Sequence, residues 1–263
     1  MTELDSGKAH IARVYDYYLG GDNNFEADRI ACAELDKVVP GTRGLCVNNR
    51  NYLRRVVRTL ASEYGIRQFI DIGAGLPTQD NVHQVARSAG PGSRVVYVDI
   101  DPIVQLHGRA LLAEDDSTAF ILQDVRQTER ILDHPDTRRL IDFSQPVAAL
   151  FFSFLHQIPD RDDPAGLVST MMSRLVPGSF MATSHLVAPD PELRGKLTDL
   201  MLNMTQGSWG RVRTTAEVDR FFDGLEVIPP GLVEITTWRP DGTAAEQQAF
   251  DWLEYGGVGR KPG

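Results

Sequence analysis

Apolar residues along the chain alternate between the spacing of a helix and that of a buried strand. In residues 51–64 they fall at i, i+3, i+4, i+7, i+8 and i+11, which is one face of a helix that Gly65 ends. Five short segments are instead predicted as strands, and the first four are near-continuous apolar runs, as in parallel strands covered on both faces. Because helical patterns separate them, we predict an α/β fold with a doubly wound, mostly parallel sheet. The five segments lie at residues 68–72, 94–98, 119–122, 146–152 and 179–184.

Capping residues mark where several helices of this alternation begin. Asp101-Pro102 and Asp163-Pro164 each place an N-cap acid before a proline at the first helical position. Residues 214–217 have the spacing of a capping box, and Pro77-Thr78 is expected to open a further helix. The remaining predicted elements are a helix over 191–204 and two final strands, over 225–238, bent at Pro229-Pro230-Gly231, and over 250–260.

Length, charge and cysteine content exclude several classes of protein. The 263 residues are enough for one large α/β domain with a full core. The net charge of −9, with scattered acids, argues against a nucleic-acid surface, which needs basic patches. Cys32 and Cys46 have no metal-like or redox spacing, so we expect reduced thiols. No signal peptide is visible, and no apolar run approaches the ~20 residues that span a bilayer. We therefore expect a cytoplasmic protein without a membrane partner, as a monomer or a homodimer.

Two of the predicted strands indicate a nucleotide-type cofactor site. The first strand contains Asp71 and leads into Gly73-Ala74-Gly75, and the second ends at Asp99. The glycines allow the backbone to approach a ligand where a Cβ would clash. An acid that closes the second strand is suited to a bidentate hydrogen bond with ribose hydroxyls. A Gly-x-Gly turn alone is common, so the indication rests on its pairing with Asp99.

Two cofactor classes share this pattern, and the neighbouring residues distinguish them. A dinucleotide site has a third glycine, where this chain has Thr78, and free backbone N–H groups, of which Pro77 removes one. Asp71 beside the turn would also repel a pyrophosphate. S-adenosylmethionine has no phosphate, and Asp71 favours its cationic sulfonium and ammonium groups. We therefore predict S-adenosylmethionine, with an NAD-dependent oxidoreductase as the less favoured alternative.

A third acid, Asp124, follows the third predicted strand, where Gln123-Asp124 could accept a hydrogen bond from the adenine amine. Each acid alone is equally explained as a loop residue that caps a helix. Since ligands of doubly wound folds bind beyond the carboxyl ends of the strands, we expect Asp71, Asp99 and Asp124 to converge there.

On these residues the chain resembles class I S-adenosylmethionine-dependent methyltransferases. It resembles more closely a prokaryotic family of S-adenosyl methyltransferases with an aromatic N-terminal segment. The motifs that carry this resemblance span nearly the whole chain: ARVYDYYLGG at 12–21, GIRQF at 65–69, GLPT at 75–78, VYVDIDP at 96–102, PGS at 177–179, WRP at 238–240 and GVGRKP at 257–262.

The resemblance implies a Rossmann-like, seven-stranded methyltransferase sheet whose last two strands form an antiparallel hairpin. It implies cofactor contacts at Asp71, Gly73, Gly75, Asp99 and Asp124, and it does not indicate an acceptor. Six further residues, next to these positions, after the fourth strand or in the aromatic segment, complete the predicted cofactor-binding set: Ala74, Ile100, Val125, Ser153, Tyr15 and Tyr18.

Methyl transfer requires the acceptor atom and the methyl group to be held in line about 3 Å apart, and a general base helps when the acceptor is a hydroxyl. Methyltransferases place residues that face the methyl group after the fourth strand, here 153–157. His156 is the predicted base, although a histidine that only lines the pocket is the simpler interpretation, and His185 is a second candidate. Motifs of nucleic-acid methyltransferases are absent from 153–157, so we predict a small-molecule acceptor, methylated on oxygen or nitrogen. A cofactor-binding regulatory protein without transfer activity is the alternative.

The first 64 residues are predicted to form a helical segment before a cofactor-binding domain at 65–263, the two making one unit. Residues 11–28 are expected to form a helix interrupted at Gly20-Gly21. Tyr15 and Tyr18 share one face of it. They either pack against the core or belong to a lid over the carboxyl edge of the sheet, facing the sulfonium or the acceptor.

Two further charged patterns are given ordinary interpretations. Asp99, Asp101 and Asp124 could bind a divalent cation, but no Asp-Asn pair follows the fifth strand, so no metal site is predicted. A basic face on the next helix is interpreted as a solvated surface and consists of Arg50, Arg54, Arg55 and Arg58.

Overall fold

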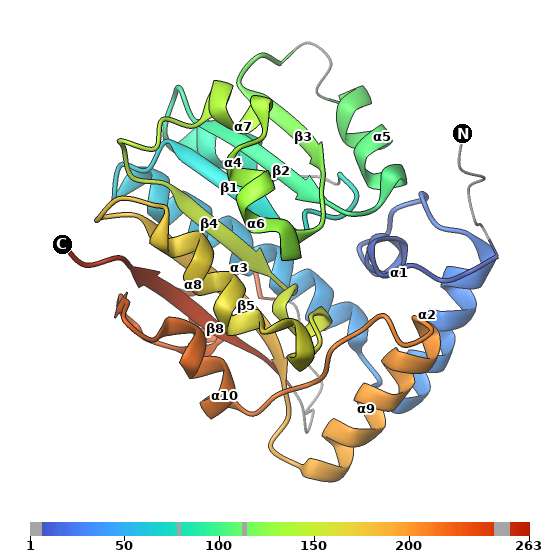
Figure 1. Cartoon of the computed structure of the whole chain (residues 1–263). Coiled ribbons are helices and arrows are strands. Elements are labelled where there is room, and N and C mark those ends of the chain that lie inside the picture. Colours follow the sequence, from blue (N-terminus) through green and yellow to red (C-terminus); the bar gives the residue numbers. More distant parts are fainter. Residues whose placement is uncertain (1–6, 78–79, 112–114, 245–252) are drawn as a thin grey trace.

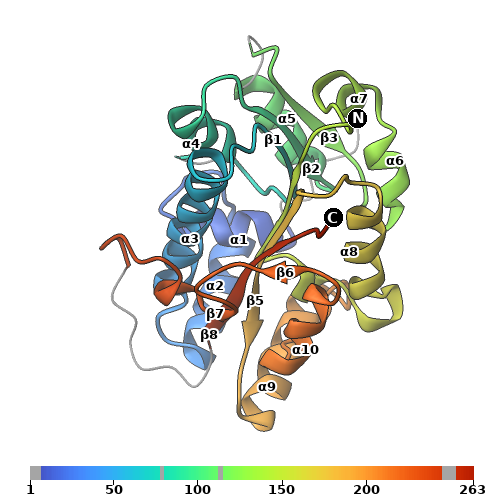
Figure 2. The same ribbon diagram turned by 90° about the vertical axis from the view of Figure 1, so that its left-hand side faces the viewer.

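The computed structural model describes residues 7–77, 80–111, 115–244 and 253–263, which are built around one sheet (Figures 1 and 2). Its strands are β1 (Gln68–Ile72), β2 (Arg94–Asp99), β3 (Thr118–Leu122), β4 (Ala148–Phe152), β5 (Phe180–Val187), β6 (Glu226–Val227), β7 (Val233–Glu234) and β8 (Leu253–Arg260). They are ordered β3-β2-β1-β4-β5-β8-β6, and β7 also pairs with β8. Strands β1 to β5 are parallel, whereas β8 is antiparallel to β5, β6 and β7.

The predicted doubly wound α/β sheet is confirmed, with one difference in the number of strands. The strand expected over 225–238 is broken into β6 and β7, and its end is the short helix η5 (Ile235–Thr237). Pro229 and Pro230 have no backbone N–H to donate to a ladder, and Gly231 turns the chain with a φ of 107°. Within the described ranges the sheet therefore has eight strands where seven were expected, and its last strands are antiparallel as predicted. The predicted start at Phe250 lies outside the described residues.

Helices cover both faces of the sheet, each over a continuous apolar core (Figure 2). On one face, α3 (Thr42–Ser62), α4 (Val82–Ala89) and α5 (Pro102–Leu111) enclose the fully buried Tyr52, Phe69 and Trp238. The opposite face is covered by α6 (Thr128–Leu132), α7 (Pro135–Leu140), α8 (Pro164–Ser173) and α10 (Thr215–Asp219). Short 3-10 helices follow several strands and helices: η1 (Val125–Gln127), η2 (Leu155–Gln157), η3 (Asp160–Asp162) and η4 (Arg220–Phe222).

A third apolar cluster lies beyond the carboxyl edge of the parallel strands. It joins α1 (Ile11–Tyr18) and α2 (Glu26–Val38) to α9 (Pro191–Met204), segments that are far apart in the sequence (Figure 1). Because this cluster is separate from the cores on the two sheet faces, α1, α2 and α9 form a second layer over the strand ends. Its buried members include Tyr18, Leu35, Leu197, Met201 and Trp209.

The helix starts predicted from capping residues are confirmed at Pro102, Pro164 and Thr215, and α9 covers the predicted residues. One start was placed too early, because α4 begins at Val82, and Thr78 of the predicted start lies outside the described residues. No helix within the described ranges is long and apolar enough to cross a membrane.

The N-terminal helices were predicted less well than the sheet. The first helix ends at Tyr18, and a separate helix, α2, begins at Glu26. Asp16 holds the loop between them, because its carboxylate accepts hydrogen bonds from Asn23 N and Asn24 Nδ2. The next helix, α3, begins at Thr42, well before the predicted start at residue 51. The start was predicted too late because polar residues on the buried face of the helix obscure the apolar spacing. The α3 helix packs into the core of the sheet. The division of the chain between residues 64 and 65 stays a prediction.

Candidate active site

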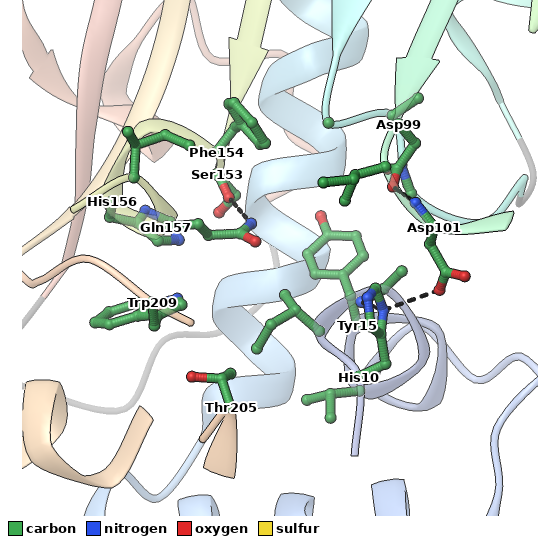
Figure 3. Close-up of a pocket in the computed structure, with 18 of the residues that line it drawn as sticks. His10, Tyr15, Asp99, Asp101, Ser153, Phe154, His156, Gln157, Thr205 and Trp209 are labelled. Atoms are coloured by element: carbon green, nitrogen blue, oxygen red, sulfur yellow. Dashed lines mark hydrogen bonds and ion pairs between the residues drawn. The ribbon is translucent and has the colours of Figure 1, made fainter. Parts of the chain in front are cut away.

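The carboxyl edge of the sheet opens into a cavity of about 980 Å³, which extends beneath α1, α2 and α9. Every residue predicted to contact the cofactor lines this cavity, and so does His156, whereas His185 does not. Figure 3 shows that the cavity has two ends. Asp99 and Asp101 lie at one end and His156 and Trp209 at the other, with Tyr15 between them.

The turn after β1 is shaped by its two glycines. Gly73 and Gly75 have φ values of 71° and 66°, in the left-handed region that favours glycine. The N–H groups of Gly73 and Ala74 donate to the Val98 carbonyl at 2.9 and 3.2 Å, which ties the turn to β2. A Cβ on Gly73 would lie 2.0 Å from Phe154 Cδ2, whereas one on Gly75 would meet no atom of the described chain within 4 Å. The turn therefore exposes the backbone of Gly75 to the cavity, while Gly73 leaves room for the Phe154 ring.

The carboxylate of Asp99 connects the loops after β1 and β2. Its Oδ2 accepts a hydrogen bond from Gly75 N and its Oδ1 accepts one from Asp101 N, both at 2.9 Å. Burial raises the pKa of Asp99, and these two backbone donors oppose that rise. Because a carboxylate can accept about four hydrogen bonds, each oxygen can still accept one from a ribose hydroxyl.

Asp71 and Arg50 place opposite charges in the same wall of the cavity. Asp71 is 6% exposed, and burial raises the pKa of its carboxyl to about 7 although the Arg50 guanidinium opposes the rise. Arg50 comes from α3, and its buried Nε has no hydrogen-bond partner among the described residues. An acid and a guanidinium with an unpaired Nε suit the ammonium and carboxylate of an amino acid, which are the groups at one end of S-adenosylmethionine.

Asp124 differs from the other two acids because it has a cation of its own. Arg126 Nε lies 3.0 and 2.8 Å from the two carboxylate oxygens, and Arg126 N donates to Oδ1 at 2.9 Å. Burial works against ionisation of Asp124, but the hydrogen bonds with Arg126 outweigh it and lower the pKa. Asp124 therefore converges with Asp71 and Asp99 on the cavity, and its contact with adenine stays a prediction. Three apolar residues of the predicted set line the cavity as well: Ala74, Ile100 and Val125.

The two predicted tyrosines are held by hydrogen bonds while they line the cavity. Tyr15 donates from its hydroxyl to the Cys46 carbonyl at 3.0 Å and accepts from Asn49 Nδ2 at 2.9 Å. The Tyr18 hydroxyl lies 3.0 and 3.1 Å from two oxygens of α2. Burial raises the pKa of both phenols, so they stay neutral. Core packing and a position over the strand ends are thus compatible, and contact with the cofactor stays a prediction.

Ser153 follows β4 in a strained conformation, with a φ of 50°. Its N–H donates to the Ser184 carbonyl at 3.1 Å and to Ser184 Oγ at 2.9 Å, which holds the backbone in place. Its own hydroxyl donates to Glu254, a buried acid at the start of β8. The strained turn therefore presents Ser153 and Glu254 together at the cavity wall.

His156 lines the cavity with a defined tautomer. Its Nδ1 accepts a hydrogen bond from Leu186 N at 3.2 Å, so the proton of the neutral ring is on Nε2. Burial, and secondarily the positive charge of Arg213, lower the pKa of His156 to about 3. A base must have a free lone pair, whereas this ring offers an N–H to the cavity. The geometry favours a hydrogen-bond donor over the predicted base.

His185 is a structural residue, and its assignment as a second candidate base is wrong. Its Nδ1 lies 2.8 Å from the Leu186 carbonyl and its Nε2 lies 2.9 Å from Arg213 Nη1. The ring therefore donates from Nδ1 and accepts at Nε2. It is completely buried and does not line the cavity, because β5 continues past Ser184 to Val187 and carries this side chain away from the strand ends.

Comparison with known proteins gives the family of the chain. The sequence model of the S-adenosyl methyltransferase family matches residues 1–262. The chain belongs to this family. A DUF574 family protein from Streptomyces avermitilis MA-4680 is 39% identical and superimposes with a TM-score of 0.92, the match covering 98% of this chain and 99% of that one.

A second solved structure supports the same assignment. A protein from Thermobifida fusca YX that is assigned as a methyltransferase is 43% identical, with a TM-score of 0.90 over 100% of this chain and 98% of that one. The N-methyltransferase NodS from Bradyrhizobium japonicum WM9, solved with S-adenosyl-L-homocysteine, is 12% identical. Its TM-score of 0.51, over 95% of this chain and 100% of NodS, shows a shared fold only. No curated protein sequence matches significantly. The protein is an S-adenosylmethionine-dependent methyltransferase.

The interpretation of the basic face of α3 as a solvated surface holds for Arg58, which is exposed, and for the partly exposed Arg54, and it is wrong for Arg55 and Arg50. Arg55 is buried and donates to the carbonyls of Trp238 and Ile235 at 2.9 and 2.6 Å, so it holds the chain after β7. Arg50 lines the cavity. A signal was available, because Arg50 precedes Leu53 by three residues and therefore lies on the apolar face of the helix.

Two more residues of the methyltransferase cavity were missed, Glu254 and His10. Glu254 is an acid inside the last predicted strand, and its sequence position alone does not show that it is buried. His10 caps α1, and its Nδ1 lies 3.1 Å from Asp101 Oδ2, in the loop after β2. This contact joins the N-terminal segment to the cofactor end of the cavity (Figure 3).

Proposed function

We propose that this methyltransferase methylates a small molecule that binds in the part of the cavity beneath α9, beside Ser153 and His156. The observation that carries this proposal is the continuity of the cavity. The acids at the carboxyl ends of β1, β2 and β3 and residues of α9 line one space, so a cofactor and an acceptor can share it. A protein that only binds the cofactor has no need for the second end.

The residues of the cofactor end fit S-adenosylmethionine, which supplies an activated methyl group when it is bound. We propose that Asp99 accepts hydrogen bonds from the ribose and that Asp71 and Arg50 bind the amino and carboxylate groups. Gly75 offers backbone where a side chain would obstruct, and Asp124 lies where adenine is expected. None of these residues exchanges a proton during transfer, and together they orient the methyl group toward the loop after β4.

The acceptor end of the cavity suits a small, largely apolar molecule. Its walls include Leu45, Leu197, Met201, Trp209 and Val212, and N-terminal helices together with α9 enclose it. The net charge of −9 supports a small molecule over a nucleic acid. We propose methylation on oxygen or nitrogen; cytoplasmic location and homodimer formation stay predictions.

Calorimetry with S-adenosylhomocysteine and with NAD tests the cofactor assignments. We expect micromolar or tighter binding of S-adenosylhomocysteine and none of NAD, with Asp99→Asn weakening the former at least tenfold. An Asp99→Asn variant that binds S-adenosylhomocysteine as tightly as the natural chain would contradict the role given to Asp99.

Transfer of a labelled methyl group tests the acceptor class. The enzyme is incubated with methyl-labelled S-adenosylmethionine and a cell extract divided by ultrafiltration into small molecules and retained macromolecules. We expect label to enter the small-molecule filtrate. Label found only in retained nucleic acid or protein would contradict the proposed acceptor class and leave the cofactor assignment unchanged.

A further inference from the structure

Glu254 is a buried carboxyl group without a complete set of partners. It is 2% exposed and lines the cavity at the start of β8. One carboxyl oxygen, Oε1, accepts a hydrogen bond from the Ser153 hydroxyl. The other, Oε2, is buried and has no hydrogen-bond partner among the described residues. A buried oxygen without a partner costs free energy, so its retention in a cavity wall points to a ligand that supplies the partner.

The sheet places Glu254 on the acceptor side of the strand ends. The order β1-β4-β5-β8 separates the glycine turn after β1 from Glu254 by the ends of β4 and β5. Glu254 pairs in register with Leu186 of β5, whose N–H donates to His156. Ser153, after β4, therefore lies between the cofactor end and Glu254, which faces the space left for the acceptor.

No cation of the described chain forms an ion pair with Glu254. Burial raises the pKa of its carboxyl to about 8; the Ser153 hydroxyl opposes that rise and Glu234 adds to it. The nearby side chains of the α1 and α3 helices, Tyr15 and Cys46, are neutral, because burial raises their pKa values. A cationic ligand would therefore be the first positive charge to pair with this carboxyl, and pairing would favour its ionised form.

We propose that Glu254 binds the amine nitrogen of the acceptor, so that the acceptor is a small apolar or aromatic amine and the enzyme is an N-methyltransferase. This inference rests on the proposed function and names its substrate class. The apolar walls beneath α9 bind the body of the amine, and Glu254 Oε2 accepts a hydrogen bond from its ammonium group. A carboxylate at the same point of the acceptor could not form this ion pair.

The same contact prepares the nitrogen for transfer. Glu254 accepts one proton from the ammonium group, which leaves a neutral amine with a free lone pair. That lone pair forms the new N–C bond while the C–S bond breaks and its electron pair stays on sulfur. The product leaves as a methylated ammonium ion, and Glu254 returns its proton to solvent. Atoms and charge balance without any further reactant.

Matched amine and alcohol probes test this inference on the full-length chain saturated with S-adenosylhomocysteine. The probes are 2-phenylethylamine against 2-phenylethanol and tryptamine against tryptophol, and dissociation constants are measured by calorimetry or ligand-observed NMR. We expect each amine to bind at least about tenfold tighter than its alcohol, because the hydrogen bond to Glu254 is charge-assisted. Glu254→Gln should remove this preference and leave alcohol binding within about twofold.

A matched variant controls for the loss of one negative charge. Glu226→Gln makes the same change at an exposed position of the same sheet and should keep the full preference for amines. Binding of S-adenosylhomocysteine to each variant shows that it is folded. If Glu254→Gln does not fold, Glu254→Asp replaces it; that variant should keep a preference for amines, reduced several-fold by the shorter side chain.

Three results would overturn the inference. They are equal binding of amines and alcohols, absence of binding by both classes, and a preference for amines that survives in Glu254→Gln. A different result would contradict the proposed function. If the natural chain does not bind S-adenosylhomocysteine, the assignment of the cofactor end is wrong.

Discussion

The cofactor end and the acceptor end of the cavity are built in different ways. The cofactor end consists of loops that directly follow β1, β2 and β3, and it offers glycine backbone and short acids. The acceptor end is assembled from α1, α3, α9 and β8, segments from both termini of the chain. The first depends on local turn chemistry, and the second depends on how distant segments pack. The comparison implies that substitutions at the cofactor end act on cofactor affinity directly, while those at the acceptor end leave that affinity nearly unchanged.

The largest expected effect is at the glycine turn. Gly73→Ala places a Cβ 2.0 Å from the Phe154 ring at a φ of 71°, so the ring or the turn must move into the cofactor end. We expect S-adenosylhomocysteine to bind about a hundredfold more weakly, a change of about 2.7 kcal/mol. The measurement is calorimetry, with thermal melting to follow stability.

Gly92→Ala is the matched control for the strain of a positive φ. Gly92 has a φ of 83° in the turn between α4 and β2, and a Cβ there would meet nothing within 4 Å in the described structure. The Gly92→Ala substitution should lower stability by about 1 kcal/mol, because it introduces the same backbone strain, and it should leave cofactor affinity unchanged. Equal losses of affinity in the two variants would show that the turn after β1 acts through stability alone.

How far each end could be predicted from the sequence follows from the same difference. The short segment of β1 and its turn contains Asp71 and Gly73, and β2 ends at Asp99. A few consecutive residues at each strand end therefore predict that these side chains and this turn line the cavity. Glu254 hydrogen-bonds Ser153 across 101 positions, and its burial depends on the pairing of β8 with β5. No local pattern contains that information, because an acid in a strand is exposed or buried according to its neighbours in the sheet.

The helices show the same limit. Where a cap is local, as at Asp163, the start of the helix was predicted correctly. The α2 helix was missed because its apolar positions are few and include small residues such as Ala31 and Cys32, whose burial requires the distant α9. Buried asparagines at positions 48 and 49 concealed the first half of α3 in a similar way. The second layer over the strand ends was thus beyond local sequence patterns.

A smaller effect is expected from the buried acid at the end of β1. The pKa of Asp71 is about 7, so its carboxyl is about one-tenth ionised at pH 6 and about nine-tenths ionised at pH 8. Since the ionised form attracts the cationic ligand, S-adenosylmethionine should bind up to about tenfold tighter at pH 8 than at pH 6. Asp71→Asn should lose this dependence, as measured by calorimetry at both pH values.

Asp124→Asn is the control within the same cavity. The pKa of Asp124 is below its ordinary value, so this acid stays ionised throughout the range and its loss should leave the pH dependence intact. Comparison of variants at the same pH also cancels any titration of the ligand. If Asp71→Asn and the natural chain show the same pH dependence, Asp71 does not bind the cationic end.

The contribution of Asp71 to the stability of the free protein should change with pH in the opposite direction. Because the pKa of Asp71 is raised from 3.8 to about 7, the native state binds more protons than the unfolded state within that window. The contribution of Asp71 to stability therefore falls as the pH rises through about 4 to 7. Thermal melting without cofactor should show that Asp71→Asn becomes more stable relative to the natural chain as the pH rises. A difference in stability that does not change with pH would contradict the raised pKa of Asp71.

The contact between the N-terminal segment and the cofactor end should have a modest effect. His10 Nδ1 lies 3.1 Å from Oδ2 of the buried Asp101, and this contact joins α1 to the loop after β2. We expect His10→Ala to weaken S-adenosylhomocysteine binding about threefold, because it removes one contact that holds the loop after β2. His134 caps α7 and lies 3.8 Å from Asp136 Oδ2, so His134→Ala makes a comparable change away from the cavity. If both variants bind the cofactor alike, the segment does not act as a lid.

For the two buried histidines, His156 and His185, we expect no change of protonation in the physiological pH range, which is the smallest effect of the series. Burial lowers the pKa of His156 to about 3 and that of His185 well below its ordinary value, so neither ring should take up a proton between pH 5 and 8. Nitrogen-15 NMR should find the proton on Nε2 of His156, since Nδ1 accepts from Leu186 N, and on Nδ1 of His185, which faces the Leu186 carbonyl. Variants with glutamine at either position assign the signals.

The tautomers decide which group at the acceptor end exchanges protons. A His156 ring that keeps its proton on Nε2 at every pH can orient an acceptor by donating a hydrogen bond, but it cannot remove a proton from one. Glu254 is then a buried group of that wall with a free oxygen to accept the proton. A His156 signal that titrates near 6.5 would instead restore the histidine as the base and limit Glu254 to binding.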